Sequence, residues 1–400
     1  MAALHRVIGI AYDNGIEQID AGESPAPPPI KSSARIPALD GLRGVAILLV
    51  LLCHSIFEFH PTSRVLSSML VVGRLTWSGV DLFFVLSGFL IGGILLDAKA
   101  SPHYFKTFYV RRAYRILPLY AVVLALFSLR YIAPHNSPGS LGTFSYSSIP
   151  WASYATFTQN FWMVMLGTFG PGALAATWSL AVEEQFYITI PLLIKRVDRS
   201  QLVLALVSIV LLAPALRTFL NTFIKHGELA CYVLMPCRAD ALSLGVLCAL
   251  VARSGRDWEF LLARRSALCW ITGLLFAGLI PFSFLRDKST LMVTIGYSLL
   301  AFFYTGCLLI AITGANATIQ RVLCNRSLGQ LGVLAYCTYL FHLPLMEAAR
   351  RFIGLRFAYS SEGVQFFGGL IGVLFTLGAA KLSWKFFEKP LLRRGHSFRY

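Results

Sequence analysis

The sequence predicts an all-α protein that crosses a membrane about ten times. Of its 400 residues, 56% are hydrophobic and 14% are charged, whereas soluble proteins have about 25% charged residues. Apolar stretches of about 18 to 24 residues are long enough to cross about 30 Å of hydrocarbon as helices. The expected spans are residues 37–57, 79–96, 116–134, 178–195, 201–220, 231–252, 266–284, 291–313, 328–349 and 363–384. Ten crossings put both chain ends on the same side.

Lysine and arginine in the connecting loops orient the chain. The loops on one side, with the two tails, contain 22 of these residues, and the loops on the other side contain 9. Because basic residues gather on the cytoplasmic side of membrane proteins, we expect both termini in the cytoplasm. The net charge of +16 is therefore mostly a consequence of topology, and we expect no nucleic-acid partner.

Composition divides the chain into one domain with two tails. Residues 1–35 contain the Pro-rich run AGESPAPPPIKSS and are expected to be a flexible cytoplasmic tail. Residues 36–392 form the membrane-embedded domain, and residues 393–400 form a basic cytoplasmic tail. Within the domain, residues 135–177 are broken by prolines and glycines and are expected to hold a re-entrant or interfacial segment. The eight cysteines include no C-x-x-C pair, so we expect no metal site.

The first span, LDGLRGVAILLVLLCHS, contains three ionisable residues: Asp40, Arg43 and His54. Each costs about 3 kcal/mol in a bilayer unless it has a partner or water. Asp40 and Arg43 are three residues apart and can pair. Arg43 and His54 lie on one helix face, about 16 Å apart along its axis. A histidine near a polar cavity is a candidate general base; the alternative for His54 is a hydrogen-bonded packing role.

The second span begins SGVDLFFVLSGFLIGG. Asp81 lies near its outer end, where packing alone does not explain a carboxylate. The Ser87-Gly88 step permits close approach by another helix or by a ligand. Both Asp81 and Ser87 are therefore candidates for a polar pocket.

The cytoplasmic loop that follows, KTFYVRRAYRILPLY, contains Arg111, Arg112 and Arg115. Guanidinium groups match phosphate oxygens in bidentate geometry, so this cluster could hold a nucleotide-type donor at the inner membrane surface. The alternative is anchoring to anionic lipid headgroups.

The fourth span begins TWSLAVEEQFYITIPLL and contains Glu183 and Glu184 side by side. Glu183 shares a helix face with Tyr187, whereas Glu184 points elsewhere. A carboxylate can orient an imidazole and stabilise its charged form, so we expect Glu183 to act on His54.

Two later spans contain further polar residues. The sixth contains Arg238 and Asp240, for which ion pairing is the simplest account. The ninth contains Tyr339 and His342, one turn apart near its outer end. Both pairs are additional pocket candidates, as are Asp40 and Glu184.

Together these motifs resemble the acyltransferase-3 family of integral-membrane O-acyltransferases over residues 35–392. The matching segments are the LDGLRG start with R-x10-H at Arg43 and His54, F-F-x-x-S-G at Phe83 to Gly88, R-x-x-R at Arg112 and Arg115, W-S-L-x-V-E-x-Q-F-Y at Trp178 to Tyr187, R-x-D-A at Arg238 to Ala241, and an L-x-H-x-P-like segment at Leu340 to Pro344.

The resemblance implies ten transmembrane helices in the bacterial inner membrane. It also implies transfer of an acyl group, commonly acetyl from acetyl-CoA, to a hydroxyl of a sugar, polysaccharide or glycolipid. Acyl-CoA is then a substrate, and no bound cofactor is expected. Arg43 and His54 would be essential, with His54 as the base and the arginines near residue 112 at the donor. Some members have a C-terminal serine-esterase-like domain, which we do not expect in a chain that stops at Tyr400.

The sequence suggests a mechanism in which acyl-CoA binds from the cytoplasm near the arginine cluster and its thioester reaches His54. Oriented by Glu183, His54 would deprotonate the acceptor hydroxyl or take the acyl group itself. Arg43, Tyr187 or Arg238 could stabilise the oxyanion. The alternatives are a proton-coupled exporter of a glycan or small molecule, for which the expected inverted repeats are not visible, and a non-catalytic scaffold.

Overall fold

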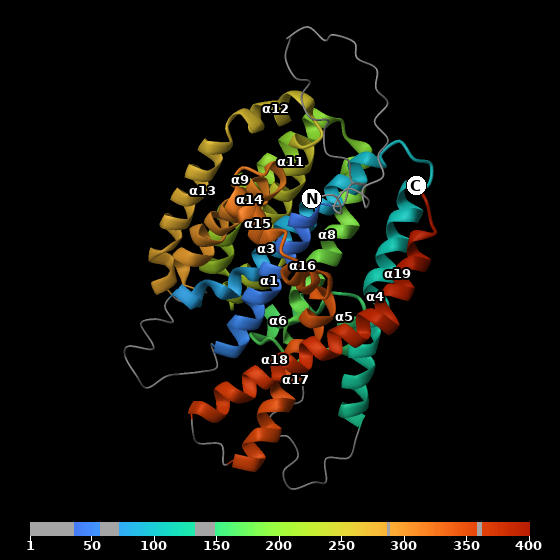
Figure 1. The fold of residues 1–400 in the computed structure, drawn as a ribbon, viewed down its shortest axis with the longest axis vertical. Helices are drawn as coiled ribbons and strands as arrows, with labels where there is room; N and C mark the ends of the chain where they lie inside the picture. The colour runs from blue at the N-terminus through green and yellow to red at the C-terminus, as the bar shows by residue number, and fades with distance from the viewer. Residues whose placement is uncertain (1–35, 57–71, 133–148, 286–288, 358–361) are drawn as a thin grey trace, which may run out of the picture.

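The computed structural model describes residues 36–56, 72–132, 149–285, 289–357 and 362–400; most of these residues are helical, and none of them is in a strand (Figure 1). This confirms the predicted all-α fold. The elements are α1 (Pro37–Ile56), η1 (Val72–Ser78), α3 (Gly79–Asp97), α4 (Tyr104–Ile132), α5 (Trp151–Ala155), α6 (Gln159–Leu166), α7 (Gly172–Ala175), α8 (Thr177–Arg196), α9 (Arg199–Phe223), α10 (Gly227–Val233), α11 (Met235–Val251), α12 (Gly255–Ala263), α13 (Arg265–Leu279), η2 (Pro281–Phe284), η3 (Met292–Gly296), α14 (Tyr297–Thr313), α15 (Ala317–Leu323), α16 (Arg326–Val333), α17 (Ala335–Phe357), α18 (Glu362–Ser383), η4 (Trp384–Glu388) and α19 (Lys389–His396).

Every predicted span falls on helix in the described ranges. Seven helices there are long and apolar enough to cross a membrane, and the bent pair α16 and α17 makes eight. The prediction of a multi-pass membrane protein is therefore confirmed. Helices α4 and α8 are also long enough, with 29 and 20 residues, but they contain several ionisable side chains. The count of ten crossings and the side on which the termini lie stay predictions.

The predicted ninth span, residues 328–349, is not one helix. Helices α16 and α17 meet at 72°. Helix α16 lies tightly against α1: a Cβ atom on Gly332 would lie 1.9 Å from the backbone oxygen of Asp40, and one on Gly44 would lie 2.2 Å from that of Leu328. Glycine lets these backbones touch. Helix α16 therefore packs across α1 instead of extending α17.

The predicted sixth span, residues 231–252, is also divided. The backbone is extended at Leu234, and Pro236 lies in the first turn of α11. Proline lacks the N–H that would continue a preceding helix, but it fits the start of a new one. The division gives the short helix α10 and the long helix α11.

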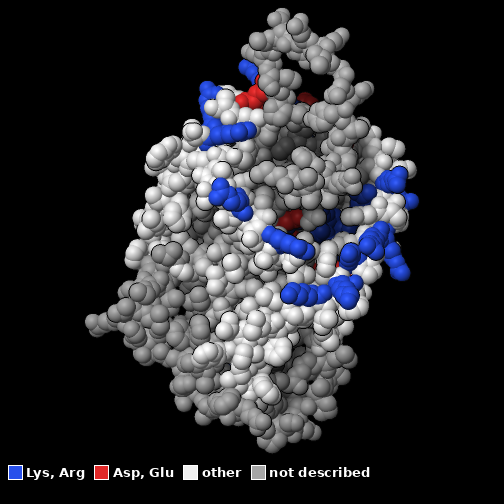
Figure 2. Space-filling view, viewed as in Figure 1, with Lys and Arg blue, Asp and Glu red and all other residues white. Residues whose placement is uncertain are grey.

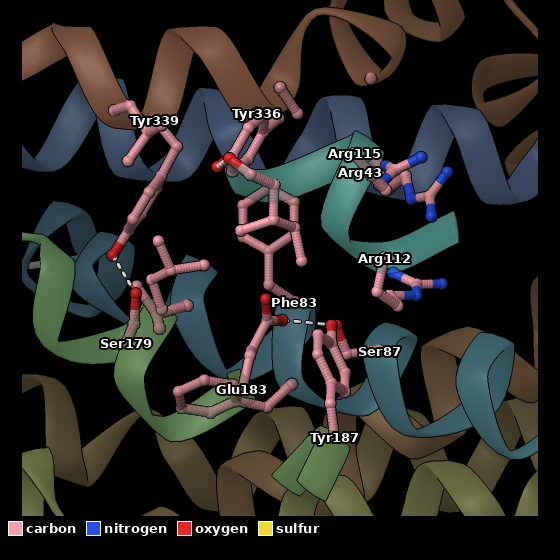
Figure 3. A pocket seen from close by; sticks show the side chains of 17 residues that line it. Arg43, Phe83, Ser87, Arg112, Arg115, Ser179, Glu183, Tyr187, Tyr336 and Tyr339 are labelled. Atoms are coloured by element: carbon pink, nitrogen blue, oxygen red, sulfur yellow. Dashed lines mark hydrogen bonds between the residues drawn. The ribbon is translucent and has the colours of Figure 1, made fainter. Parts of the chain in front are cut away.

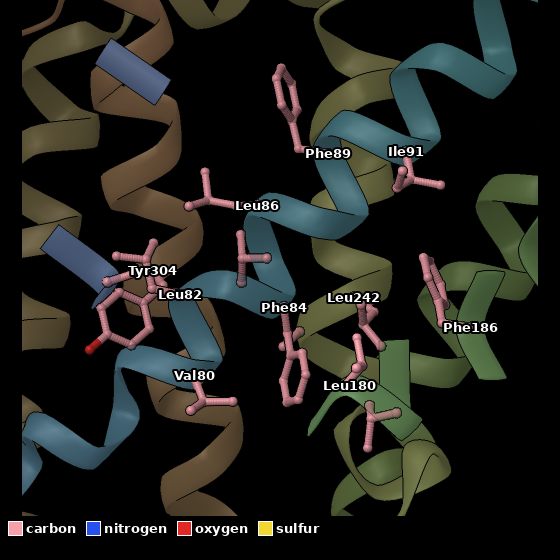
Figure 4. Packing of buried hydrophobic residues seen from close by; sticks show 14 of the residues in the cluster. Val80, Leu82, Phe84, Leu86, Phe89, Ile91, Leu180, Phe186, Leu242 and Tyr304 are labelled. Atoms are coloured by element: carbon pink, nitrogen blue, oxygen red, sulfur yellow. The ribbon is translucent and has the colours of Figure 1, made fainter. Parts of the chain in front are cut away.

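Helix α3 is buried along most of its length and packs closely on α11. A Cβ atom on Gly88 would lie 2.0 Å from the backbone oxygen of Leu242, and one on Gly245 would lie 2.2 Å from that of Val85. Figure 4 shows the apolar side chains of α3 packed between α8, α11 and α14. The close approach predicted at the Ser87-Gly88 step is thus a helix–helix contact.

Two peripheral segments differ from simple loops. The described part of residues 135–177 consists of the short helices α5, α6 and α7. Part of the predicted tail 393–400 belongs to α19, which packs beside α4 (Figure 1). The predicted tail 1–35 lies outside the described residues. On the face in Figure 2, lysine and arginine lie over the upper and middle parts of the molecule.

Candidate functional site

A polar cavity of about 110 Å³ lies between α1, α3, α4, α8, α16 and α17. Figure 3 shows the side chains that point into it. Its walls are formed by Arg43, Val80, Phe83, Phe84, Ser87, Arg112, Arg115, Ile116, Ser179, Leu180, Glu183, Tyr187, Gly332, Ala335, Tyr336, Tyr339 and Leu340. Polar side chains from helices far apart in sequence thus meet in one cavity.

Three arginines gather at one end of the cavity: Arg43 of α1 and Arg112 and Arg115 of α4 (Figure 3). Arg43 is 3.7 Å from the carboxylate of Asp40, which confirms the predicted local pair. The guanidinium carbon of Arg112 lies 5.2 Å from the ring centre of Tyr187. Three guanidinium groups at one end of the cavity suit it to an anion, and the carboxylates of Asp40, Glu183 and Glu388 partly balance their charge.

Arg111, the third arginine of the predicted donor-binding cluster, does not line the cavity with Arg112 and Arg115. Its guanidinium donates to the backbone oxygen of Phe398 at 2.9 and 2.6 Å, and it lies 5.0 Å from the ring centre of Tyr400. The reason is helical geometry, since adjacent residues project about 100° apart whereas Arg112 and Arg115 share a face. Burial raises the pKa of Tyr400, and Arg111 and Arg112 oppose that rise.

Ser87, Glu183 and Tyr187 form a hydrogen-bonded group in the middle of the cavity. The hydroxyl of Ser87 donates to the carboxylate of Glu183 (Figure 3), and it lies 3.2 Å from the hydroxyl of Tyr187. Glu183 and Tyr187 are four residues apart on α8, as predicted from their spacing. Both line the cavity.

The end of the cavity away from the arginines is formed by Tyr339 and Ser179, whose hydroxyls are 2.5 Å apart. The hydroxyl of Tyr339 also reaches the backbone oxygen of Ala176 at 3.1 Å. The hydroxyl of Tyr336 donates to the backbone oxygen of Ile116 at 2.8 Å. Sequence reasoning did not single out Ser179 and Tyr336. For Ser179 a signal existed, because residues 179, 183 and 187 repeat every four positions along one helix face.

His54 packs against His342 and not against Glu183, which corrects the predicted histidine–carboxylate contact. Their ring centres are 4.7 Å apart. Nδ1 of His54 donates to the backbone oxygen of Val50 at 3.0 Å, and Nδ1 of His342 donates to that of Tyr339 at 2.6 Å. Because each Nδ1 faces a carbonyl oxygen, Nδ1 carries the proton of the neutral ring and Nε2 is its acceptor nitrogen.

The histidine pair lies beside the cavity, and neither histidine is among its lining residues. The ring of His342 is 5.6 Å from that of Tyr339, which does line the cavity. His342 is fully buried, and its Nε2 has no hydrogen-bond partner among the described residues. Tyr339 and His342 thus connect the cavity to His54.

Asp81, Arg238 and Asp240 belong to buried ion pairs outside the cavity. Arg238 pairs with Asp81 across α11 and α3, and Asp240 pairs with Arg217 of α9 at 2.9 Å. The sequence did not identify Arg217, which is fully buried. Glu184, on another face of α8, also does not line the cavity. Asp81 and Asp240 therefore hold helices together, and Glu184 lies apart from the cavity.

Comparison with known proteins identifies the family. A family model described as an acyltransferase domain matches residues 36–380. The chain belongs to this acyltransferase family. The matched range includes all the residues that line the cavity.

Several curated relatives are similar over 90% of this chain. A putative peptidoglycan O-acetyltransferase of Bacillus subtilis is 28% identical, a peptidoglycan O-acetyltransferase of Listeria monocytogenes 26%, and an O-acetyltransferase of Staphylococcus aureus 24%. The chain covers 55%, 56% and 58% of their respective lengths. No solved structure matches the chain.

Proposed function

We propose that this protein transfers an acetyl group from acetyl-CoA to a hydroxyl of a carbohydrate or glycolipid at the bacterial inner membrane. The observation that carries the proposal is a cavity between membrane helices with three arginines at one end and a carboxylate with two hydroxyls at its centre. Membership of the acyltransferase family and similarity to O-acetyltransferases support this reaction.

The arginine end is the proposed donor site. Guanidinium groups bind phosphate oxygens in bidentate geometry, and coenzyme A is rich in phosphate. The cavity itself, about 110 Å³, has room for the reacting end of the donor and not for its nucleotide. The nucleotide therefore lies outside, at the cytoplasmic surface near Arg112 and Arg115, and the thiol arm extends inward toward Glu183.

His54 is the proposed base for the acceptor. Its Nδ1 is engaged by the carbonyl of Val50, which leaves Nε2 to accept a proton from a hydroxyl. His342 contacts the His54 ring, where the sequence had predicted a contact with Glu183. The acceptor would approach through the Tyr339 end of the cavity. Because relatives are named as acting on peptidoglycan, a carbohydrate acceptor is the first to test.

The reaction is tested with membranes that contain the full chain, isotope-labelled acetyl-CoA and peptidoglycan or glycolipid fractions. We expect acceptor-dependent release of coenzyme A with label in the carbohydrate fraction, and loss of both signals in His54→Ala. Export of an unmodified glycan without acetyl-CoA consumption would instead support the proton-coupled exporter. Near-normal transfer by folded His54→Ala would remove His54 from the chemistry.

A further inference from the structure

Ser87 is one of the few side chains of α3 that face the cavity. Most of this helix is buried, but the side chains of Ser87 and of Phe83, one turn earlier, open onto the cavity. The adjacent Gly88 touches the backbone of Leu242 so closely that a Cβ atom would lie 2.0 Å away. Because packed helices at such a contact cannot slide or rotate freely, α3 holds the Ser87 hydroxyl in a fixed position.

The hydroxyl of Ser87 faces a carboxylate that can act as a base. It donates to Glu183, and among the described residues no lysine or arginine lies within 4.0 Å of the Glu183 carboxylate. The carboxylate is therefore not engaged in an ion pair and can take the proton of the hydroxyl. A serine hydrogen-bonded to a base is the usual arrangement of an activated nucleophile.

The rest of the cavity suits an acyl-transfer step. Arg43, Arg112 and Arg115 line the same walls as Ser87 (Figure 3). Positive groups in such a site stabilise negative charge that develops on a carbonyl oxygen and on a departing thiolate. The hydroxyl of Tyr187, 3.2 Å from Ser87 Oγ, can donate to the same oxygen. The base, the nucleophile and the anion-stabilising groups thus face one space.

We propose that Ser87 takes the acyl group from the donor as an ester before the acceptor receives it, an inference that rests on the function proposed above. Ser87 Oγ attacks the thioester carbonyl carbon while Glu183 takes the hydroxyl proton. The tetrahedral intermediate collapses, the carbon–sulfur bond breaks, and coenzyme A leaves as a thiolate that takes a proton from water. Ser87 then carries the acyl group, and Glu183 is protonated.

The second half-reaction regenerates both residues. The acceptor hydroxyl attacks the carbonyl carbon of the Ser87 ester, and its proton passes through a water molecule to His54, which lies beside the cavity. When the bond to Ser87 Oγ breaks, the serine oxygen takes the proton from Glu183. His54 releases its proton to water, which balances the proton taken by the thiolate. The donor and acceptor therefore need not occupy the cavity together.

The experiment uses the full chain purified into lipid nanodiscs. The protein is mixed with labelled acetyl-CoA without acceptor, quenched in acid, and digested for peptide mass spectrometry. We expect one acetyl group per chain on the peptide that contains Ser87, released when acceptor is added before the quench. Ser87→Ala should carry no label, and Glu183→Gln should acquire it about 10²- to 10⁴-fold more slowly.

Two further variants keep the result interpretable. Ser87→Cys should form a thioester that neutral hydroxylamine cleaves, whereas the serine ester resists hydroxylamine. If Ser87→Ala does not fold, the Ser87→Cys variant still tests whether position 87 carries the acyl group. Ser243→Ala, which removes a buried serine of α11 that does not line the cavity, should label like the parent protein.

Three results would overturn the proposal: acetyl on another residue, such as His54; turnover with acceptor but no adduct in the parent protein; or full transfer by folded Ser87→Ala. Each of these would leave the proposed acetyl-CoA-dependent transfer intact. Failure of the parent protein to consume acetyl-CoA with any carbohydrate fraction would instead reject the proposed function.

Discussion

The imidazole rings of His54 and His342 lie in edge-to-face contact, with centres 4.7 Å apart. His54 is on α1 and His342 is on α17, so the contact joins the first helix of the domain to one near its end. His342 in turn contacts Tyr339 at the cavity wall. The proposed acceptor base is therefore held by a second histidine and lies on the side of the cavity opposite the arginines.

Replacing His54 by Ala should lower kcat by about 10²- to 10⁴-fold, the usual contribution of a general base. The KM for acetyl-CoA should change little, because the arginines of the proposed donor site remain in place. Steady-state kinetics in nanodiscs checks both values. His103→Ala is the matched control, since His103 is exposed and does not line the cavity. An equal loss in the control would point to a general defect of the preparation.

Replacing Arg112 or Arg115 by Ala should raise the KM for acetyl-CoA by about 10- to 100-fold, because a hydrogen bond to a charged group contributes about 1.5–3 kcal/mol. Arg111→Ala should leave it nearly unchanged, because that guanidinium is bound to the backbone of Phe398. Initial rates over a range of acetyl-CoA concentrations distinguish the variants. An unchanged KM in Arg112→Ala and Arg115→Ala would instead favour anchoring of the chain to lipid.

Replacing Asp81 by Ala should destabilise the protein by about 3–5 kcal/mol, because it leaves the buried guanidinium of Arg238 without its carboxylate. The double variant Asp81→Ala, Arg238→Leu should recover part of this loss, since neither charge then remains buried. Unfolding in detergent, followed by size-exclusion chromatography after heating, measures the difference. A double variant less stable than Asp81→Ala would contradict the purely structural role.

Replacing Gly88 by Ala should destabilise the protein, because the added methyl would lie 2.0 Å from the backbone oxygen of Leu242 and would push α3 from α11. Gly273→Ala on α13 is the matched control. No atom lies within 4 Å of its added Cβ, and loss of glycine flexibility should raise stability by about 0.4–1 kcal/mol. The same heating assay compares them, and equal behaviour of the two variants would exclude a tight α3–α11 contact.

Contacts within one helix could be predicted from the sequence, because the helical repeat fixes them. The pair Asp40 and Arg43 and the shared face of Glu183 and Tyr187 are examples. The same repeat could also have separated Arg111 from Arg112 and Arg115. The helical spans themselves followed from the length and apolar character of the segments.

Contacts between helices could not be predicted, because they depend on the order and rotation of helices in space. Asp81 pairs with Arg238 and Asp240 with Arg217, but spacing along one helix leaves every such combination open. The sequence predicted Glu183 beside His54, whereas the structure has His342 there, for the same reason. The bend between α16 and α17 depends on glycines whose role appears only when α1 lies against them.

Asp40 links this bend to the cavity, since its backbone oxygen lies against Gly332 and its carboxylate pairs with Arg43. A larger residue at position 332 would have to be accommodated by a shift of α1, which would carry Arg43 with it. Evolution should therefore allow positions 40, 44, 328 and 332 to vary only in compatible combinations. Correlated substitution among these four positions across related sequences would be the trace of that constraint.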